Sequence, residues 1–382
     1  MSAVRIACPP LALALLLAAA PQARAIDLGT VGGFDLAFEG LLQVDGYRYR
    51  GDWSDHGDDT DFRRAELVLK GEHPGGFDWV VGYDVKSEKW LDVNARVRFA
   101  DTSQYLRAGQ FKQPAGLEEL SSSSGNDFIA KAAATNAFAI SRRLGVGWGM
   151  DRGDWSLAAS WFDRELTDDQ AEGRGVAARG TWAPVRDDGH VLHLGLSASR
   201  FDAPDDGIRM RARPNADLAD IRLLDTGILA DARRQATVGA EAMWFQGPVK
   251  LQAEWFQSTV DRNASPDFDA SGGYVSALWN PGGQTWGYRD GVPRTPAAGS
   301  GRSGVWQLGL RYDRLDLDDP GAGGVHGGTM DVWTAGVNWY HGDHLKLMLN
   351  YVDASTRRQA APAAGWLQVD PASIQMRAQL TW

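Results

Sequence analysis

The chain has 382 residues, with 49 acidic against 39 basic side chains and a net charge of −10, so it offers no overall attraction to nucleic acid. Its one cysteine, Cys8, lies near the N-terminus, which leaves the rest of the chain without a disulfide, a thiol nucleophile or a cysteine metal ligand. Beyond the N-terminal region no run of about 18 apolar residues occurs, which excludes membrane-spanning helices. The 16 tryptophans and 45 glycines favour a β-rich protein.

The N-terminal 25 residues are predicted to be a secretory signal peptide. Arg5 gives a positive start, residues 11–20 form an apolar run, and Ala23-Arg-Ala25 is a small-residue cleavage site. A membrane anchor helix is the alternative, but the apolar run is too short to span a bilayer and a cleavage site follows it. We therefore expect a signal peptide at 1–25 and a single mature domain at 26–382.

Sixteen segments of alternating apolar and polar residues follow in the chain, and each is typical of a strand with one apolar and one wet face. Their approximate limits are 34–47, 62–73, 77–87, 91–100, 103–112, 142–150, 154–163, 174–186, 190–202, 235–246, 249–258, 270–280, 304–315, 330–341, 344–354 and 373–382. The last segment alternates throughout and ends on an aromatic side chain: Ile374, Met376, Ala378, Leu380 and Trp382.

The connections alternate between short and long. Tight turns occur at 73–76, 100–103, 151–153, 246–248 and 341–343, and long polar segments occur at 48–61, 113–141, 201–234 and 355–372. This rhythm predicts an all-β fold: a 16-stranded antiparallel transmembrane β-barrel in the bacterial outer membrane, with short periplasmic turns and long surface loops. A buried β-sandwich would also alternate. The connection 281–303 is long where a short turn is due, so either that turn is elaborated or the strand count slips there.

The same alternation assigns charged side chains to the barrel lumen. The basic ones are Arg64, Lys70, Arg96, Arg98, Lys112, Lys250, Arg311, Lys346 and Arg377. Acidic ones accompany them: Glu66, Asp78, Asp84, Glu241 and Glu254. Two interpretations stay open, because these charges could simply pair across a water-filled interior or could form a basic path that attracts small anions.

The third long loop, 113–141, is expected to narrow the lumen. It carries four serines, Ser121 to Ser124, then Gly125, and it is bracketed by Lys112 and Lys131. Several hydroxyl donors with one or two cations suit the recognition of phosphate in a wet pore. A serine run by itself is more often a flexible loop.

An ordered series of motifs resembles the phosphate-selective porin family, of the porin O and P type, over nearly all of the mature sequence. The Asp61–Leu67 segment is similar to the family's paired-arginine strand, and Leu106–Glu118 resembles its Gly-Gln-Phe-Lys stretch followed by Pro, Gly and Leu-Glu. The motifs that follow in order are 141–145, 224–227, 305–312, 336–340 and 349–351.

The resemblance implies a homotrimer of 16-stranded barrels, each with a loop folded into its channel, that passes phosphate, polyphosphate and other small anions over a basic lining. Arg63 and Arg64 match the paired arginines, and Lys112 matches the motif lysine. Lys131 departs from the Glu-Arg pair that is usual in the family. Together with the lumen assignment, this gives the expected pore-lining set: Arg63, Arg64, Lys70, Arg96, Arg98, Lys112, Ser122, Ser123, Lys131, Arg142, Arg143 and Arg311.

Two other functions compete with an anion channel. A general or differently selective outer-membrane porin with weak anion preference is favoured by the acidic lumen residues, of which Glu66 lies on the same face as Arg64. A barrel enzyme would need Ser, His and a polar partner on one face, and no such group is found around His193. His190 and His193 lie three apart on a strand and so point to opposite faces, which makes them poor metal ligands. No cofactor or metal is expected, and no nucleic-acid partner.

Overall fold

A computed structural model describes residues 26–382 except 54–57, 101, 168–170, 297–303 and 360–364. The signal peptide predicted at 1–25 lies outside the described residues. Over the part that is described, no helix combines the length and the apolar character needed to cross a membrane.

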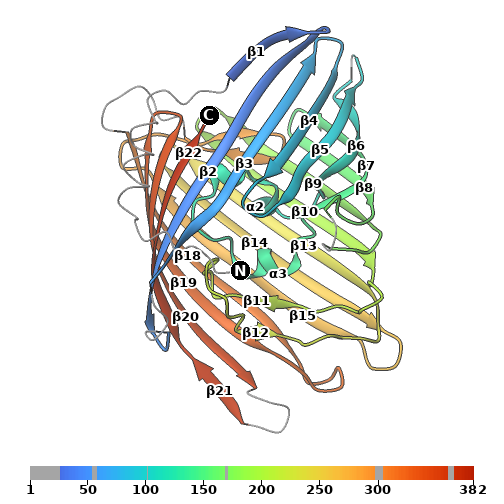
Figure 1. The fold of residues 1–382 in the computed structure, drawn as a ribbon, viewed down its shortest axis with the longest axis vertical. Coiled ribbons are helices and arrows are strands. Elements are labelled where there is room, and N and C mark those ends of the chain that lie inside the picture. Colours follow the sequence, from blue (N-terminus) through green and yellow to red (C-terminus); the bar gives the residue numbers. More distant parts are fainter. Residues whose placement is uncertain (1–25, 54–57, 101, 168–170, 297–303, 360–364) are drawn as a thin grey trace.

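Sixteen of the described strands close into one antiparallel barrel, and each pairs with its neighbours along the chain (Figure 1). The barrel strands are β2 (Phe34–Gly51), β3 (Asp59–His73), β4 (Phe77–Asp84), β5 (Lys89–Arg98), β6 (Gln104–Lys112), β7 (Arg142–Arg152), β8 (Trp155–Phe162), β9 (Gly175–Asp187), β10 (His190–Asp202), β13 (Ala232–Gln246), β14 (Val249–Arg262), β15 (Phe268–Trp279), β18 (Val305–Asp319), β19 (Val325–His341), β20 (Leu345–Gln359) and β22 (Pro371–Thr381). Each of the sixteen predicted segments coincides with one of these strands, so the prediction of a 16-stranded barrel is confirmed.

The remaining described elements are short. β1 (Ile26–Val31) extends β2 as a hairpin beyond the barrel, and β21 (Trp366–Val369) pairs with the far end of β20. Two small hairpins lie in connections: β11 (Arg211–Ala212) with β12 (Leu224–Asp225), and β16 (Gly287–Arg289) with β17 (Val292–Arg294). The third loop contains α2 (Leu117–Leu120), the 3₁₀ turn η2 (Ser123–Gly125) and α3 (Ala133–Phe138), and Figure 1 shows α2 and α3 inside the barrel.

Closure of the barrel pairs a strand near the start of the described chain with the last strand. Residues 41–51 of β2 pair with residues 371–381 of β22, and the backbone N–H of Gly40 donates to the carbonyl of Trp382 at 3.0 Å. The indole of Trp382 covers Gly40 so closely that a Cβ there would lie 2.0 Å from the ring. Glycine is therefore required where the terminal aromatic side chain crosses the seam. A closed barrel leaves no strand edge unpaired, as a membrane interior demands.

The two faces of the wall differ as the alternation predicts. Large apolar side chains are exposed on the outside, among them the tryptophans Trp90, Trp155, Trp161, Trp182, Trp255, Trp279, Trp306 and Trp333. On β14 the inward residues Lys250, Gln252 and Glu254 are buried, whereas Leu251 and Trp255 between and beside them are exposed. An apolar band with aromatic residues on the outside and a polar lining inside are features of an outer-membrane barrel.

The long connection after β15 is an elaborated turn, and the strand count does not slip there. β15 pairs directly with β18, and between them the chain forms the β16–β17 hairpin. Trp286 and Val292 of this connection are buried in a cluster with Leu117 of the third loop. The turn therefore folds back into the barrel and meets the third loop.

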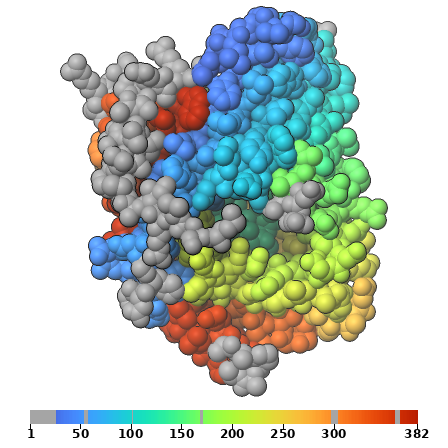
Figure 2. Space-filling view, in the orientation of Figure 1, coloured from blue at the N-terminus to red at the C-terminus, as the bar shows by residue number. Residues whose placement is uncertain are grey.

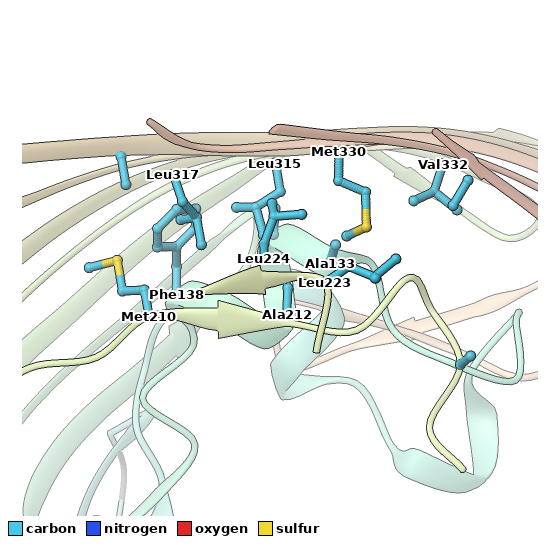
Figure 3. Close-up of a cluster of buried hydrophobic side chains, with 14 of the residues drawn as sticks. Ala133, Phe138, Met210, Ala212, Leu223, Leu224, Leu315, Leu317, Met330 and Val332 are labelled. Atoms are coloured by element: carbon cyan, nitrogen blue, oxygen red, sulfur yellow. The ribbon is translucent and has the colours of Figure 1, made fainter. Parts of the chain in front are cut away.

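A second inward segment is the connection between β10 and β13. Its β11–β12 hairpin packs between α3 and the strands β18 and β19, as Figure 3 shows. The cluster is apolar: Ala133, Phe138, Met210, Ala212, Leu223, Leu224, Leu315, Leu317, Met330 and Val332. Figure 2 shows a hollow on this face of the molecule, between the cyan strands and the yellow-green residues of this connection.

Candidate functional site

The third loop is fastened to one side of the barrel by its backbone. Glu254 of β14 accepts hydrogen bonds from the backbone N–H groups of Leu117 and Glu118, at 2.6 and 2.7 Å, and so caps the start of α2. Glu118 in turn accepts from the backbone N–H of Ala132 and the hydroxyl of Thr135, which links α2 to α3. A loop that is capped and cross-linked in this way holds a fixed shape inside the lumen.

Side chains of β14 and β18–β22 complete the attachment. Lys250 donates to the Asp127 carboxylate at 2.6 Å, Lys346 to the Asn126 carbonyl at 2.5 Å, and Arg377 to the Ile129 carbonyl at 2.8 Å. Further hydrogen bonds to the loop come from Arg311, Asn338, Asn350 and Gln379. These residues hold the loop, which leaves the opposite wall of β3 to β7 facing the open lumen.

Two cavities lie between the third loop and the β3–β7 wall. The larger, of about 1210 Å³, reaches the turn end of the barrel and is lined by Trp382, Arg96, Arg98 and Ser121–Ser124 among others. The smaller, of about 250 Å³, lies toward the long loops and is lined by Arg63, Arg64 and Lys131. The two cavities share five lining residues, which we call the junction: Glu66, Leu91, Lys112, Ser123 and Arg142.

Lys112 is the junction cation without a carboxylate partner. Its ammonium donates to the carbonyls of Glu119 and Ser121, at 2.5 and 3.0 Å, and among the described residues no carboxylate lies within 4.0 Å of it. Arg142, by contrast, forms a forked pair with Asp92, at 2.9 and 2.7 Å. Lys112 therefore brings to the junction a positive charge that no contacting carboxylate cancels.

Arg63 and Arg64 both face the lumen although they are adjacent on β3. The pairing of β3 with β2 passes from Arg64 to Phe62, so Arg63 is the extra residue of a β-bulge. A bulge lets two successive side chains lie on the same face. Arg63 then pairs with Asp217 of the β11–β12 connection at 2.9 Å, and Arg64 with Glu66 at 3.2 Å.

Most of the other expected pore-lining cations have acidic partners. Arg96 pairs with Asp78 at 3.0 Å, Arg98 with both Asp78 and Glu72, and Lys70 with Glu39. All three basic residues line the larger cavity.

Lys131 pairs with Glu119 within the third loop. Burial alone would raise the pKa of the Glu119 carboxyl, but the ammonium groups of Lys131 and Lys112 outweigh it and bring the pKa to about 2. Ser122 and Ser123 line the larger cavity, and the hydroxyl of Ser122 shares a 2.8 Å hydrogen bond with that of Ser124.

Two of the expected residues serve the framework. Arg143 is 7% exposed and donates to the carbonyls of Ile140 and Arg142 and to Glu165, away from the cavities. Arg311 is 1% exposed and donates to Glu118 and the carbonyl of Ala130, so it holds the third loop. The alternating pattern predicts the face on which a side chain lies, but it does not predict its hydrogen-bond partner.

The sequence reasoning missed several lumen cations. Arg107 lines the larger cavity, lies over the rings of Tyr105 and Phe111 at 5.5 and 5.3 Å, and has no carboxylate within 4.0 Å among the described residues. Arg289 and Arg294 of the β16–β17 hairpin line the same cavity. No strand pattern marks that hairpin in the sequence.

A further basic group was missed in the β10–β13 connection. Burial, together with the nearby Arg213 and Arg211, lowers the pKa of Arg222. The same segment carries Arg209, which pairs with Asp225. The repeat of arginine at every second position, 209, 211 and 213, is the signal that could have identified this group.

A closed 16-stranded barrel with an aromatic outer band, a charged lumen and a loop fastened inside it defines an outer-membrane porin. The phosphate-selective porin O and P family matches residues 37–382, and the chain belongs to that family. The matched region includes every barrel strand except the start of β2.

Two relatives resemble the sequence. An uncharacterized protein of Caulobacter vibrioides is 33% identical over 320 residues, which is 76% of this chain but only 62% of that relative. Porin O of Pseudomonas aeruginosa is 25% identical over 409 residues and is covered over 92% of its length, with 90% of this chain aligned.

Solved structures with the same fold are outer-membrane proteins. OmpT of Vibrio cholerae matches with a TM-score of 0.60 and 10% identity, covering 94% of this chain and all of that one. An anion-selective porin from Comamonas acidovorans matches with a TM-score of 0.57 and 12% identity, over 91% of this chain and all of that one. The protein is thus an outer-membrane channel by family and fold.

Proposed function

We propose that the protein is a passive channel for small anions, of which phosphate and polyphosphate are the substrate class, and that the junction is its constriction. The observation that carries the proposal is Lys112, which lines both cavities and, among the described residues, donates to carbonyl groups alone. A cation held at a narrow point lowers the barrier for anions and raises it for cations, while its carbonyl contacts keep it in place.

Further cations that form no ion pair among the described residues support the direction of selectivity. Arg211, Arg213 and Arg222 lie close together in the inward β10–β13 connection, and Arg107 lines the larger cavity. Positive charges in or near the lumen raise the local concentration of anions there. The serine hydroxyls at 121–124 then offer weak donors that a hydrated oxyanion can exchange for water.

The test is the zero-current potential of the purified protein in a planar bilayer under a chloride gradient, followed by addition of phosphate. We expect an anion-signed potential and a block of chloride current by phosphate. Lys112→Met should lower the anion-to-cation permeability ratio about fivefold and raise the half-blocking phosphate concentration about tenfold, since one unpaired charge contributes roughly 1–2 kcal/mol in a wet lumen.

The matched control is Lys86→Met, because Lys86 pairs with Asp61 and is exposed at the loop end of the barrel. It should change neither quantity. A cation-signed potential in the unmodified protein, or a Lys112→Met variant that behaves as the control does, would contradict the proposal.

The second candidate is a general porin with weak anion preference. It is favoured by the pairing of most lumen cations, in particular Arg64 with Glu66, Arg142 with Asp92 and Lys131 with Glu119. An anion-signed potential without block by phosphate would support this candidate.

We further propose that residues 1–25 are removed on export and that three chains assemble in the membrane. One OmpT structure from Vibrio cholerae is described as a trimer form, and it shares this fold with a TM-score of 0.60. The mass of the detergent-solubilised protein, measured by light scattering with detergent correction, tests the assembly, and N-terminal sequencing tests the cleavage site.

A further inference from the structure

A third cavity lies behind the third loop, on the side away from the β3–β7 wall. This chamber, of about 240 Å³, is bounded by the third loop, by the strands β14, β15 and β18, and by the β16–β17 hairpin and the residues after it. It shares Ser121, Ser122, Ser124 and Arg294 with the larger cavity. The serine run therefore lies between the chamber and the proposed conduction path.

Two buried residues of the chamber carry donors that lack a hydrogen-bond acceptor among the described residues. They are the indole Nε1 of Trp286, whose side chain is 3% exposed, and the Nε and Nη2 of Arg311, which is 1% exposed. The Arg311 Nε lies 3.3 Å from the Asp313 carboxylate as an ion pair, which leaves Nη2 for the chamber. Arg311 is held in place by its Nη1, which donates to Glu118 and to the carbonyl of Ala130, and by the ring of Phe128 beneath it at 4.8 Å. Buried donors without partners cost free energy unless something in the cavity accepts from them.

Two buried acceptors of the chamber also lack donors. They are Oε1 of Gln252 and Oδ1 of Asn126. The amide of Gln252 has a defined orientation, because its Nε2 donates to the hydroxyl of Tyr274, whose own proton goes to Glu254 at 2.7 Å. Gln252 therefore presents its oxygen, and a partner for it must carry a hydrogen.

The unpaired hydrogen-bonding groups, and not the net charge, define the class of ligand. Lys250, Arg294 and Arg311 are the basic lining residues and Glu118 and Asp127 the acidic ones. Arg294 also pairs with Asp290, and Arg311 with Asp313. A solute that satisfies the unpaired atoms of the chamber must accept hydrogen bonds from the Arg311 guanidinium and the Trp286 indole and donate one to the Gln252 oxygen. An oxyanion that retains a proton does both, whereas a fully deprotonated oxyanion leaves the Gln252 oxygen facing negative charge.

We propose that this chamber is a second anion site, off the conduction path, which binds a protonated tetrahedral oxyanion of the phosphate type and rejects deprotonated oxyanions such as sulfate. Arg311 and Trp286 supply the donors, and Gln252 supplies the acceptor that senses the proton. The proposal rests on the proposed function only in taking the lumen to be open to small anions.

The first experiment uses crystals of the full-length protein soaked, below neutral pH, in arsenate or in selenate, which are distinguishable by anomalous scattering. Arsenate keeps a proton under these conditions and selenate does not. We expect an arsenic peak between Trp286 and Arg311 and no selenium peak there. Equal occupancy by both anions would overturn the role of Gln252, and absence of arsenate from the chamber would overturn the site.

The second experiment measures phosphate binding to the detergent-solubilised protein by calorimetry. Trp286→Phe keeps the ring and removes the donor, and should weaken binding to the chamber at least about tenfold, the usual loss for a hydrogen bond to a charged group. Gln252→Met, which removes the acceptor for the proton of the oxyanion, should weaken it as well. The control is Trp306→Phe, since Trp306 is half exposed on the outer face.

The two proposals fail in different ways. Trp286→Phe should leave the zero-current potential unchanged, and Lys112→Met should leave the arsenic peak in place. A cation-signed potential with arsenate still bound would defeat the anion channel and keep the chamber. Normal phosphate binding by both chamber variants would defeat the chamber whatever the channel does.

Discussion

Glu66 is the lumen carboxylate best placed to oppose anion passage. It lies at the junction, where it pairs with Arg64 at 3.2 Å, and both side chains are largely buried, at 12% and 15% exposure. Arg64 also donates to Gln43 at 2.7 Å, so it stays in position when its acidic partner loses charge. While Glu66 is ionised, its negative charge cancels most of the attraction that Arg64 exerts on a passing anion. Neutralising Glu66 should therefore strengthen that attraction.

We predict that Glu66→Gln raises the anion-to-cation permeability ratio about fivefold, because removing one negative charge near the path changes the energy of an anion there by about 1 kcal/mol. The measurement is the zero-current potential under a chloride gradient. The control is Asp61→Asn, whose carboxylate is half exposed at the loop end and pairs with Lys86. Equal potentials for Glu66→Gln and the unmodified protein would contradict the prediction.

Glu119 gives the third loop a dependence on pH. Its pKa is lowered from 4.5 to about 2, with burial opposed and outweighed by Lys131 and Lys112. Because the pKa falls on folding, the pair with Lys131 stabilises the folded loop fully above pH 4.5, and this contribution is lost as the pH falls through about 2.

The resulting prediction concerns selectivity at low pH. As the pH is lowered through about 2, protonation of Glu119 frees the Lys131 ammonium, and the zero-current potential should shift toward stronger anion preference. Glu119→Gln should show that stronger preference already at pH 4.5. The difference between the two proteins should be about halved near pH 2 and vanish below it, and a constant difference over the whole range would count against the mechanism.

At the scale of elements, the third loop depends on one carboxylate for its first turn. Glu254 accepts from two backbone N–H groups, of Leu117 and Glu118, and a neutral amide in its place can accept with only one atom. We predict that Glu254→Gln loosens the loop and increases current noise and mean conductance in single-channel records, with little change in barrel stability.

The matched control for this prediction is Ser258→Ala, four residues away on the same face of β14, which removes a lumen hydroxyl that bonds to Gln235 and Thr237 of β13 and leaves the cap intact. It should keep the quiet current of the unmodified protein. Quiet current in Glu254→Gln would show that the remaining wall contacts, from Lys250, Lys346 and Arg377, suffice to hold the loop.

The sequence predicted elements that obey a period and missed those that do not. Every barrel strand has a side-chain period of two, so its existence and its inward face can be read from residues alone. The β16–β17 hairpin has three residues in each strand and no alternation long enough to detect. Its inward fold is decided by tertiary contacts, such as Trp286 and Val292 against Leu117.

The partners of the lumen cations were the other feature that could not be predicted from the sequence. Arg63 and Arg64 lie on one face because of a bulge whose position depends on the register with β2. Which cations remain unpaired likewise follows from distances between strands: Arg311 reaches the third loop, whereas Arg107, on β6, meets two aromatic rings. The alternating pattern predicts which face of the wall a side chain lies on, whereas its ion-pair partner depends on the register between strands.

At the scale of the whole molecule, one ion pair connects the closing seam of the barrel with the third loop inside the lumen. Asp45 of β2 and Arg377 of β22 are direct partners across the closing seam, both side chains are fully buried, and two hydrogen bonds of 2.6 Å connect them. Arg377 also donates to the Ile129 carbonyl of the third loop at 2.8 Å. The seam and the loop thus share one guanidinium.

We predict that Arg377→Met lowers the free energy of unfolding by about 3–5 kcal/mol, since it leaves the Asp45 carboxylate buried without its partner. The measurement is urea unfolding of the barrel in lipid vesicles, followed by tryptophan fluorescence. Asp45→Asn with Arg377→Gln should recover a large part of the loss, because the amides can still pair. Lys86→Met, which removes an exposed pair, should change the value by less than about 1 kcal/mol.

The same variants separate closure of the barrel from attachment of the loop. Arg377→Met removes both contacts, so it should combine lower stability with the noisy current expected of Glu254→Gln. Asp45→Asn leaves the guanidinium free to hold Ile129, so its current should stay quiet even where its stability falls. If the current of Asp45→Asn is as noisy as that of Arg377→Met, the position of the third loop depends on the pairing of β2 with β22. The loop could then not be loosened without also weakening the barrel wall.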